Sequence, residues 1–155
     1  MARNIVLEFE RGGAVEAELL TEEAPRTCEA ILKALPVRNK AVHAMWAGEE
    51  LFFDGFPLSE PLVFENETND PEPGSLACIA SAATRRFRKE NITSFCIFYG
   101  RAIPRGAVDQ EIDVTVFGRA DEVAGMADIG RRIRRRGVER STITRSGAAD
   151  AGPET

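Results

Sequence analysis

Short runs in which apolar and polar side chains alternate constrain this chain more than any other feature of its sequence. In residues 4–10, NIVLEFE, the apolar Ile5, Leu7 and Phe9 take alternate positions, and AVEAELL at 14–20 alternates in the same way. A strand points successive side chains to opposite faces, so each run predicts a strand with one buried face. The two runs flank an RGG sequence, and glycines between alternating runs predict a β-hairpin.

Two other segments follow the helical period. Residues 22–36 place apolar side chains three and four positions apart, with Pro25 near the start and Pro36 at the end, as an amphipathic helix prefers. Residues 120–137 repeat this pattern, with acids first, five arginines near the end and Gly137 last. This order fits the dipole and the C-cap of a helix. We therefore predict one early and one late helix.

Strand patterns fill most of the remaining chain. Further strands are predicted at residues 37–46, 50–53, 75–80, 93–99, 112–118 and 141–145. About eight strands and two helices predict a mainly β fold, a closed antiparallel eight-stranded barrel whose open ends are capped by two α-helices. In this prediction residues 1–145 form one domain, and the small and polar residues 146–155 form a disordered C-terminal tail.

Composition narrows the classes of partner. The net charge of −5 argues against nucleic acid, because phosphate binding needs clustered positive charge. No apolar run approaches the ~20 residues of a membrane span, so we expect no membrane association. Three cysteines that lie far apart fit reduced thiols in a cytoplasmic protein. One histidine and scattered acids give no metal-ligand spacing, so we expect no metal and no cofactor.

Several phrases, in this order, resemble the cyclophilin-like proteins. Residues 12–35 are similar to the opening strand and helix of that family, and PEPGSLACIA at 71–80 to its proline-glycine turn and following strand. SFCIFYG at 94–100 resembles an inner strand, and VTVFG at 114–118 the strand that leads into the last helix. The resemblance spans about residues 3–145 and implies a cyclophilin-like barrel. A bacterial branch of unknown function is a closer match, since its members carry phrases like HAxWAGEE.

The activity of cyclophilins depends on an arginine that follows a phenylalanine-histidine pair. That arginine polarises the prolyl amide and lowers a rotation barrier of ~20 kcal/mol. If His43 matches the histidine, Ala44 stands at the arginine position, and residues 94–96, SFC, lack the glutamine usual there. We therefore expect standard isomerase activity to be absent, with Arg101 or an arginine of 85–88 as the alternative source of a cation.

The only histidine, His43, and the only tryptophan, Trp46, lie close together in the sequence. On a continuous strand the period of two places them on opposite faces. One interpretation is that Trp46 and the phenylalanines after it fill the barrel, with His43 an ordinary strand residue. The other is a pocket with an aromatic wall and a polar tip, formed by His43, Trp46 and either Glu49 or Glu50.

The leading functional hypothesis is a pocket for a small molecule, including one that bears a carboxylate, or for a short peptide. The candidate lining residues are polar or aromatic and lie near predicted strand ends: His43, Trp46, Glu50, Phe53, Tyr99 and Arg101. The basic segment 81–91 is either an exposed hairpin tip or a lid that brings Arg85 or Arg88 over the barrel mouth to pair a carboxylate.

Three alternatives stay open. The first is a prolyl isomerase with a non-standard site. The second is a non-catalytic interaction module, such as a homo-oligomer formed through an exposed edge strand or through the arginine-rich helix end, which otherwise is a solvated face or a weak polyanion patch. The third is a cysteine nucleophile, Cys96 activated by His43, although a cysteine in an apolar run more often packs as a small hydrophobe.

Overall fold

The computed structural model describes residues 4–58, 62–79, 92–105 and 111–147. Within them the strands are β1 (Asn4–Phe9), β2 (Ala14–Leu19), β3 (Val37–His43), β4 (Gly48–Pro57), β5 (Glu67–Thr68), β6 (Ser75–Cys78), β7 (Ile92–Ala102), β8 (Val114–Ala120) and β9 (Glu139–Arg145). The helices are α1 (Pro25–Ala34) and α2 (Val123–Arg136).

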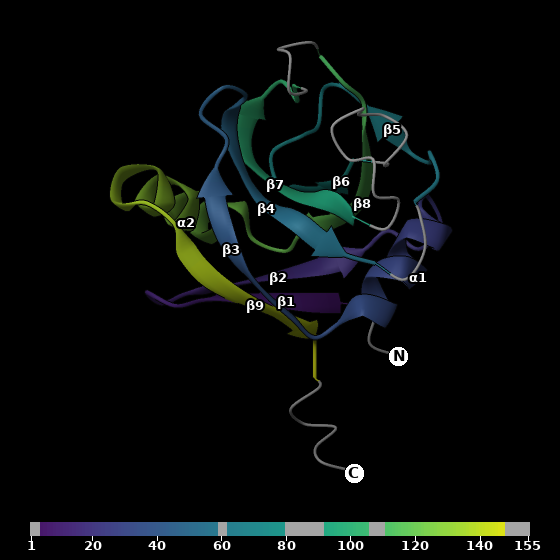
Figure 1. Ribbon diagram of the computed structural model, residues 1–155, viewed down its shortest axis with the longest axis horizontal. Coiled ribbons are helices and arrows are strands. Elements are labelled where there is room, and N and C mark those ends of the chain that lie inside the picture. Colours follow the sequence, from purple (N-terminus) through teal and green to yellow (C-terminus); the bar gives the residue numbers. More distant parts are fainter. Residues whose placement is uncertain (1–3, 59–61, 80–91, 106–110, 148–155) are drawn as a thin grey trace.

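Antiparallel pairing closes the sheet into a barrel. Eight strands follow one another in the order β2, β1, β9, β3, β4, β7, β6 and β8, and β8 pairs with β2 again. The short β5 pairs with Val114 and Thr115 of β8, beyond the residues of β8 that pair with β2, and is not part of the ring. The described residues therefore confirm the predicted mainly β fold with a closed eight-stranded barrel and two helices (Figure 1).

The local sequence signals explain most of these elements. β1 and β2 form the predicted hairpin, with Leu7 opposite Val15 and both side chains buried. Pro25 occupies the first turn of α1, and the Glu65 carboxylate accepts hydrogen bonds from the backbone N–H and the hydroxyl of Thr27 at 2.6 and 2.7 Å. Gly137 ends α2 with φ of +98°, a conformation that favours glycine.

The main differences from the prediction concern β3, β4 and β5. β3 ends at His43, and residues 44–47 form the turn to β4, so Trp46 does not lie on a strand. β4 extends well beyond 50–53, because it pairs with the long β7 through two register shifts. β5 was not predicted, since two polar residues carry no periodic signal. Residues 148–155 of the predicted tail lie outside the described residues.

Two apolar clusters lie on opposite sides of the barrel wall. The larger fills the interior with side chains from all eight ring strands and from both helices. The smaller covers the outer side of β4, β6, β7 and β8 and includes Phe98, Cys96 and Val116. The same strands therefore have two buried faces, and the face a residue occupies determines its surroundings. Neither described helix is long and apolar enough to cross a membrane.

Candidate functional site

His43 and Tyr99 form a polar pair inside the barrel beneath α2. His43 is the last residue of β3 and lies opposite Leu51 of β4, an interior residue. Its Nε2 lies 2.8 Å from the Tyr99 hydroxyl, and the two rings meet edge to face with centroids 5.7 Å apart. The other ring nitrogen, Nδ1, is buried without a hydrogen-bond partner among the described residues.

The surroundings keep both partners uncharged near neutral pH. Burial lowers the pKa of His43, and the positive charge of Arg134 lowers it further, against a smaller opposing effect of Glu49. Burial also raises the pKa of Tyr99, and Glu49 adds to that rise. A neutral imidazole has one donor and one acceptor nitrogen, so the pair exchanges a single hydrogen bond whose direction depends on the tautomer.

Gly130 of α2 gives Tyr99 its room. A Cβ atom added at Gly130 would lie 2.3 Å from Cδ2 and 2.5 Å from Cε2 of the Tyr99 ring, far closer than atoms approach in proteins. The helix backbone therefore lies directly on the aromatic ring. This close approach fixes the Tyr99 hydroxyl against His43.

Glu50 lies on the other side of the wall. It is opposite Phe98 in the β4–β7 pairing, and the next outward pair is Phe52 with Cys96. The Glu50 side chain is only 6% exposed, and burial raises its pKa to about 7, with a partly compensating hydrogen bond from the Cys96 thiol. We call this surface, with Glu50, Phe52, Cys96 and Phe98, the outer face.

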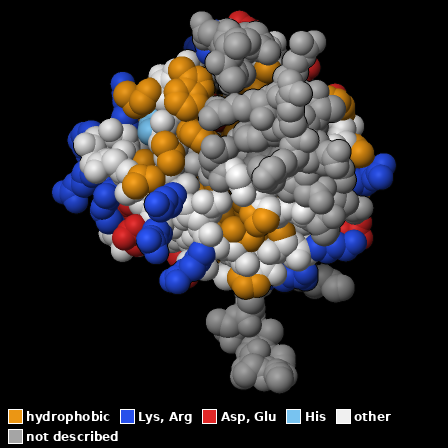
Figure 2. Space-filling model, viewed as in Figure 1, with side chains coloured by type: hydrophobic (Ala, Val, Ile, Leu, Met, Phe, Trp, Pro, Cys, Tyr) orange, Lys and Arg blue, Asp and Glu red, His pale blue; other side chains and the backbone are white. Residues whose placement is uncertain are grey.

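Trp46 extends the outer face into solvent. Its indole packs edge to face on Phe52, with centroids 5.5 Å apart, and 53% of Trp46 remains exposed. Met45 beside it is exposed as well. Figure 2 shows hydrophobic side chains gathered over the turn between β3 and β4, at the upper left of the view. We call Trp46 and Phe52 the aromatic edge, and it lies next to the buried carboxyl group of Glu50.

The structure does not bring the six candidate lining residues to one surface. His43, Tyr99 and Phe53 point to the interior, and Phe53 is fully buried against Phe95. Trp46 and Glu50 belong to the outer face. The Arg101 side chain is exposed, and its backbone N–H donates to Glu49 at 3.1 Å. Arg85 and Arg88 lie outside the described residues.

These positions also separate the cysteine from the histidine. Cys96 packs in the outer cluster, whereas His43 bonds to Tyr99 in the interior. The described contacts of His43 and Cys96 therefore give no support to a Cys96 thiol activated by His43. Among the described residues, no group of three or more His, Cys, Asp or Glu side chains gathers closely enough to hold a metal ion. The interpretation that Trp46 and the phenylalanines after it fill the barrel fits Phe53, but Phe52 and Trp46 lie on the outer face. Phe98, opposite Glu50, belongs to the same face and was not among the predicted site residues.

Comparison with known proteins shows the fold and the family. A family model described as "Protein of unknown function (DUF3830)" matches residues 7–145. A structure of McbB in complex with tryptophan is similar to 92% of this chain, with a TM-score of 0.67 and 15% identity, and this chain spans only 45% of its length. The hypothetical protein AF2241 from Archaeoglobus fulgidus is similar over 93% of this chain and 95% of its own, with a TM-score of 0.59 and 23% identity. No curated protein matches.

Proposed function

Since the chain belongs to the DUF3830 family of proteins of unknown function, we propose a function from its own side chains: the outer face binds a small molecule with a flat apolar body and an amine group. The Glu50 carboxyl group carries this proposal. It is 6% exposed, its pKa is raised to about 7, and it lies on an aromatic surface that reaches solvent at Trp46.

A buried carboxyl without a cationic partner is costly to the fold. Ionised carboxylates lose hydration when they leave water, and side chains with strongly raised pKa values therefore gather at binding and catalytic sites. Among the described residues, no Lys or Arg forms an ion pair with Glu50. A ligand amine would supply the missing charge and form a charge-assisted hydrogen bond with the carboxylate.

The aromatic edge suits the apolar part of such a ligand. Tryptophan offers a large rigid contact area, and an exposed indole beside exposed methionine is typical of surfaces that bind ligands or partners. Phe52 supports the indole from below and lies two residues from Glu50 on the same strand. McbB, which is similar in fold to this chain, was solved in complex with tryptophan, and a ligand that combines an aromatic ring with an amine is the class proposed here.

The other ligand classes lack a comparable group on the outer face. A carboxylate ligand would meet the acidic Glu50, and the Arg101 side chain extends into solvent. The resemblance to cyclophilin-like proteins remains a proposal about fold ancestry. Prolyl isomerase activity has no support from position 44, because the Ala44 side chain is small, apolar and buried.

A pair of ligands matched in shape and opposite in charge tests the proposal. Trp46 is the only tryptophan, so its fluorescence reports binding at the outer face. At pH 8, where Glu50 is ionised, we expect 2-phenylethylamine to change the Trp46 emission at concentrations about tenfold lower than 3-phenylpropionate does.

Two variants complete the experiment. Glu50→Gln keeps the shape of the side chain and should abolish the preference for the amine. Val138→Thr alters an exposed apolar side chain that lies between α2 and β9, and should leave binding unchanged. Equal binding of both ligands to the unmodified protein, or no response to either, would contradict the proposal.

A further inference from the structure

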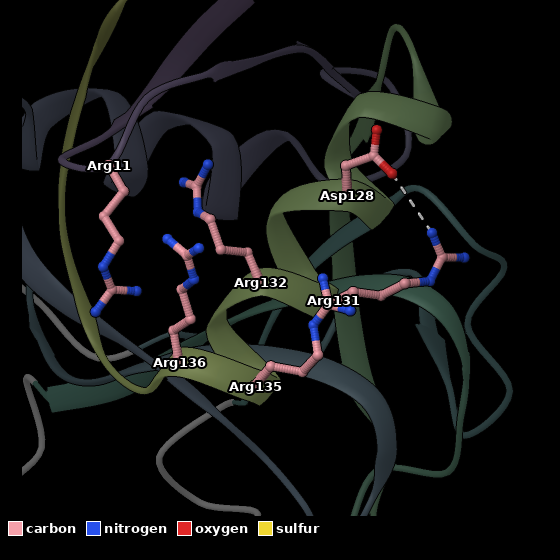
Figure 3. A pocket seen from close by; sticks show the side chains of 6 residues that line it. All are labelled: Arg11, Asp128, Arg131, Arg132, Arg135 and Arg136. Atoms are coloured by element: carbon pink, nitrogen blue, oxygen red, sulfur yellow. Dashed lines mark ion pairs between the residues drawn. The ribbon is translucent and has the colours of Figure 1, made fainter.

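Five arginines line a depression at the C-terminal end of α2. The lining consists of Arg11 from the β1–β2 turn and five residues of α2, four arginines and one acid: Arg11, Asp128, Arg131, Arg132, Arg135 and Arg136. The cavity volume is about 490 Å³. Figure 3 shows Arg132 and Arg136 extending from α2 toward the side on which Arg11 lies. We call this site the arginine depression, and none of its residues belongs to the outer face.

Two of the arginines are held rigidly by Glu139. The Glu139 side chain is fully buried and accepts hydrogen bonds from Arg132 Nε at 2.6 Å and Nη2 at 2.8 Å, and from Arg11 Nη1 at 3.0 Å. Backbone carbonyls of Gly12 and Gly137 accept further bonds from the same guanidinium groups. These bonds use Nε and Nη2 of Arg132, and within the described ranges no hydrogen bond engages its Nη1, which can donate to a ligand.

The positive charges of the other three arginines are only weakly balanced by acidic side chains. Arg131 lies 3.6 Å from the exposed Asp128, and in the part of the chain that the structure describes no carboxylate lies within ion-pair distance of Arg135 or Arg136. The two acids, Glu139 and Asp128, offset two of the five positive charges, which leaves a local charge of +3. This local charge is opposite in sign to the net charge of −5 of the chain.

A helix end alone does not require this arrangement. Cations stabilise a helix through its dipole only within the last turn, and Arg131 and Arg132 precede that turn. The spacing here places Arg131 beside Arg135, and Arg132 beside Arg136, four residues apart, where like charges repel and destabilise the helix. An anion with several charges would remove this repulsion.

We propose that the arginine depression binds a small molecule through a phosphate or diphosphate group. The planar fork of arginine pairs phosphate oxygens with two parallel hydrogen bonds, and the site offers several forks around one volume. Arg11 and Arg132 use most of their donors on Glu139 and on backbone carbonyls, so they contribute fixed positive charge with little loss of side-chain entropy, and the forks not used in this way are those of Arg135 and Arg136. The acidic surface of the rest of the chain repels long polyanions, whereas a compact anion needs only the local positive field.

Calorimetric titration with pyrophosphate tests this proposal. The measurement uses the full chain at about 0.15 M salt, where charges more than about 8 Å apart are screened. We expect saturable binding that Arg135→Gln with Arg136→Gln weakens about tenfold or more, since charge-assisted bonds are lost. The matched control is Arg134→Gln with Arg140→Gln, which removes the same charge outside the depression and should weaken binding less than twofold if screening holds.

Three results would overturn the proposal. One is the absence of pyrophosphate binding. Another is an equal loss of pyrophosphate affinity in the two double variants, because it would show that only the total charge of the protein matters. The third is binding of a poly-glutamate peptide or a DNA duplex without binding of pyrophosphate, which assigns the surface to a macromolecule. If the first variant fails to fold, the Arg Nε–H resonances of the unmodified protein decide, because pyrophosphate must shift those of Arg135 and Arg136 and not that of Arg134.

Discussion

Replacement of Glu139 by glutamine should destabilise the fold far more than removal of an ordinary surface charge. Glu139 is the first residue of β9, and its buried carboxylate joins the β1–β2 turn to α2 through Arg11 and Arg132. It accepts three bonds from the two guanidinium groups and one from the backbone N–H of Arg11 at 3.2 Å. Glutamine keeps the volume, loses the charge and turns an NH₂ group toward donors.

The expected magnitude follows from this geometry. A hydrogen bond to a charged group contributes about 1.5–3 kcal/mol, and loss of one partner of a buried ion pair costs about 3–5 kcal/mol. The two arginine side chains keep 32% and 22% of their exposure, so water compensates part of the lost charge. We therefore expect the free energy of unfolding to fall by about 2–4 kcal/mol.

Urea denaturation at pH 7 measures this change, with Glu72→Gln as the control. Glu72 also forms an ion pair with an arginine, Arg119, at 3.0 Å, but both side chains are largely exposed. Exposed pairs contribute about 0–1 kcal/mol, so the control should stay in that range. A double-mutant cycle of Glu139→Gln with Arg132→Gln should show coupling of about 1–3 kcal/mol. If Glu139→Gln costs no more than Glu72→Gln, the reasoning is refuted.

The same residue predicts a dependence on pH. Burial raises the pKa of Glu139, but hydrogen bonds from Arg132 and Arg11 outweigh that effect, and its pKa in the folded protein lies below the ordinary value. Its stabilisation is therefore complete above the ordinary value of 4.5 and is lost as the pH falls through the lower folded pKa. Between pH 5 and pH 3, Glu139→Gln should lose less stability than the unmodified protein.

Three further changes test the packing and the polar groups. Gly130→Ala should destabilise the protein by about 1–3 kcal/mol because the added Cβ meets the Tyr99 ring. The control is Gly125→Ala on the same helix, where the added Cβ would meet only a carboxylate oxygen of Glu122 at 3.3 Å, and it should change the melting temperature little or raise it. Tyr99→Phe removes the hydroxyl that shares a hydrogen bond with His43 Nε2 and should lower the free energy of unfolding by about 1–3 kcal/mol, as measured by urea denaturation. The pKa of Glu50 is raised from 4.5 to about 7, so the free-energy cost of burying its charge is absent below about pH 4 and complete above pH 7. Glu50→Gln should therefore stabilise the protein by about 3 kcal/mol at pH 8 and should have little effect at pH 4. Thermal melts at both pH values measure this difference.

Local patterns were sufficient for the framework of the fold. The hairpin of β1 and β2 and both helices depend on periodicity, on proline and on glycine, which act within a few residues. Closure of the barrel was predicted from the number of strands and the order of the elements. The end of β3 at His43 was not, because alternation continues through Trp46 and no breaker precedes Ala47-Gly48.

The sites depend on contacts that no local pattern records. Glu139 bonds to Arg11 across 128 positions of the sequence, and nothing near Glu139 distinguishes it from a solvent-exposed acid at the start of a strand. The closeness of His43 to Tyr99 depends on the order of strands in the ring, since β4 lies between β3 and β7. Sequence alternation predicted that His43 and Trp46 would separate, and the turn at residues 44–47 then carried Trp46 to the outer face.

Two neighbouring acids show how the barrel wall determines chemistry. Glu49 and Glu50 are the same residue type, one position apart on β4. Glu49 lies across Gly100, accepts the backbone N–H of Arg101 and remains partly exposed, whereas Glu50 is buried among aromatic side chains, where its pKa rises to about 7. Because the barrel wall is a single sheet, neighbouring residues of one strand face opposite sides, and two identical side chains meet different surroundings. The reactivity of each acid follows from the face it occupies, which is why Glu50, and not Glu49, is the residue on which ligand binding should depend.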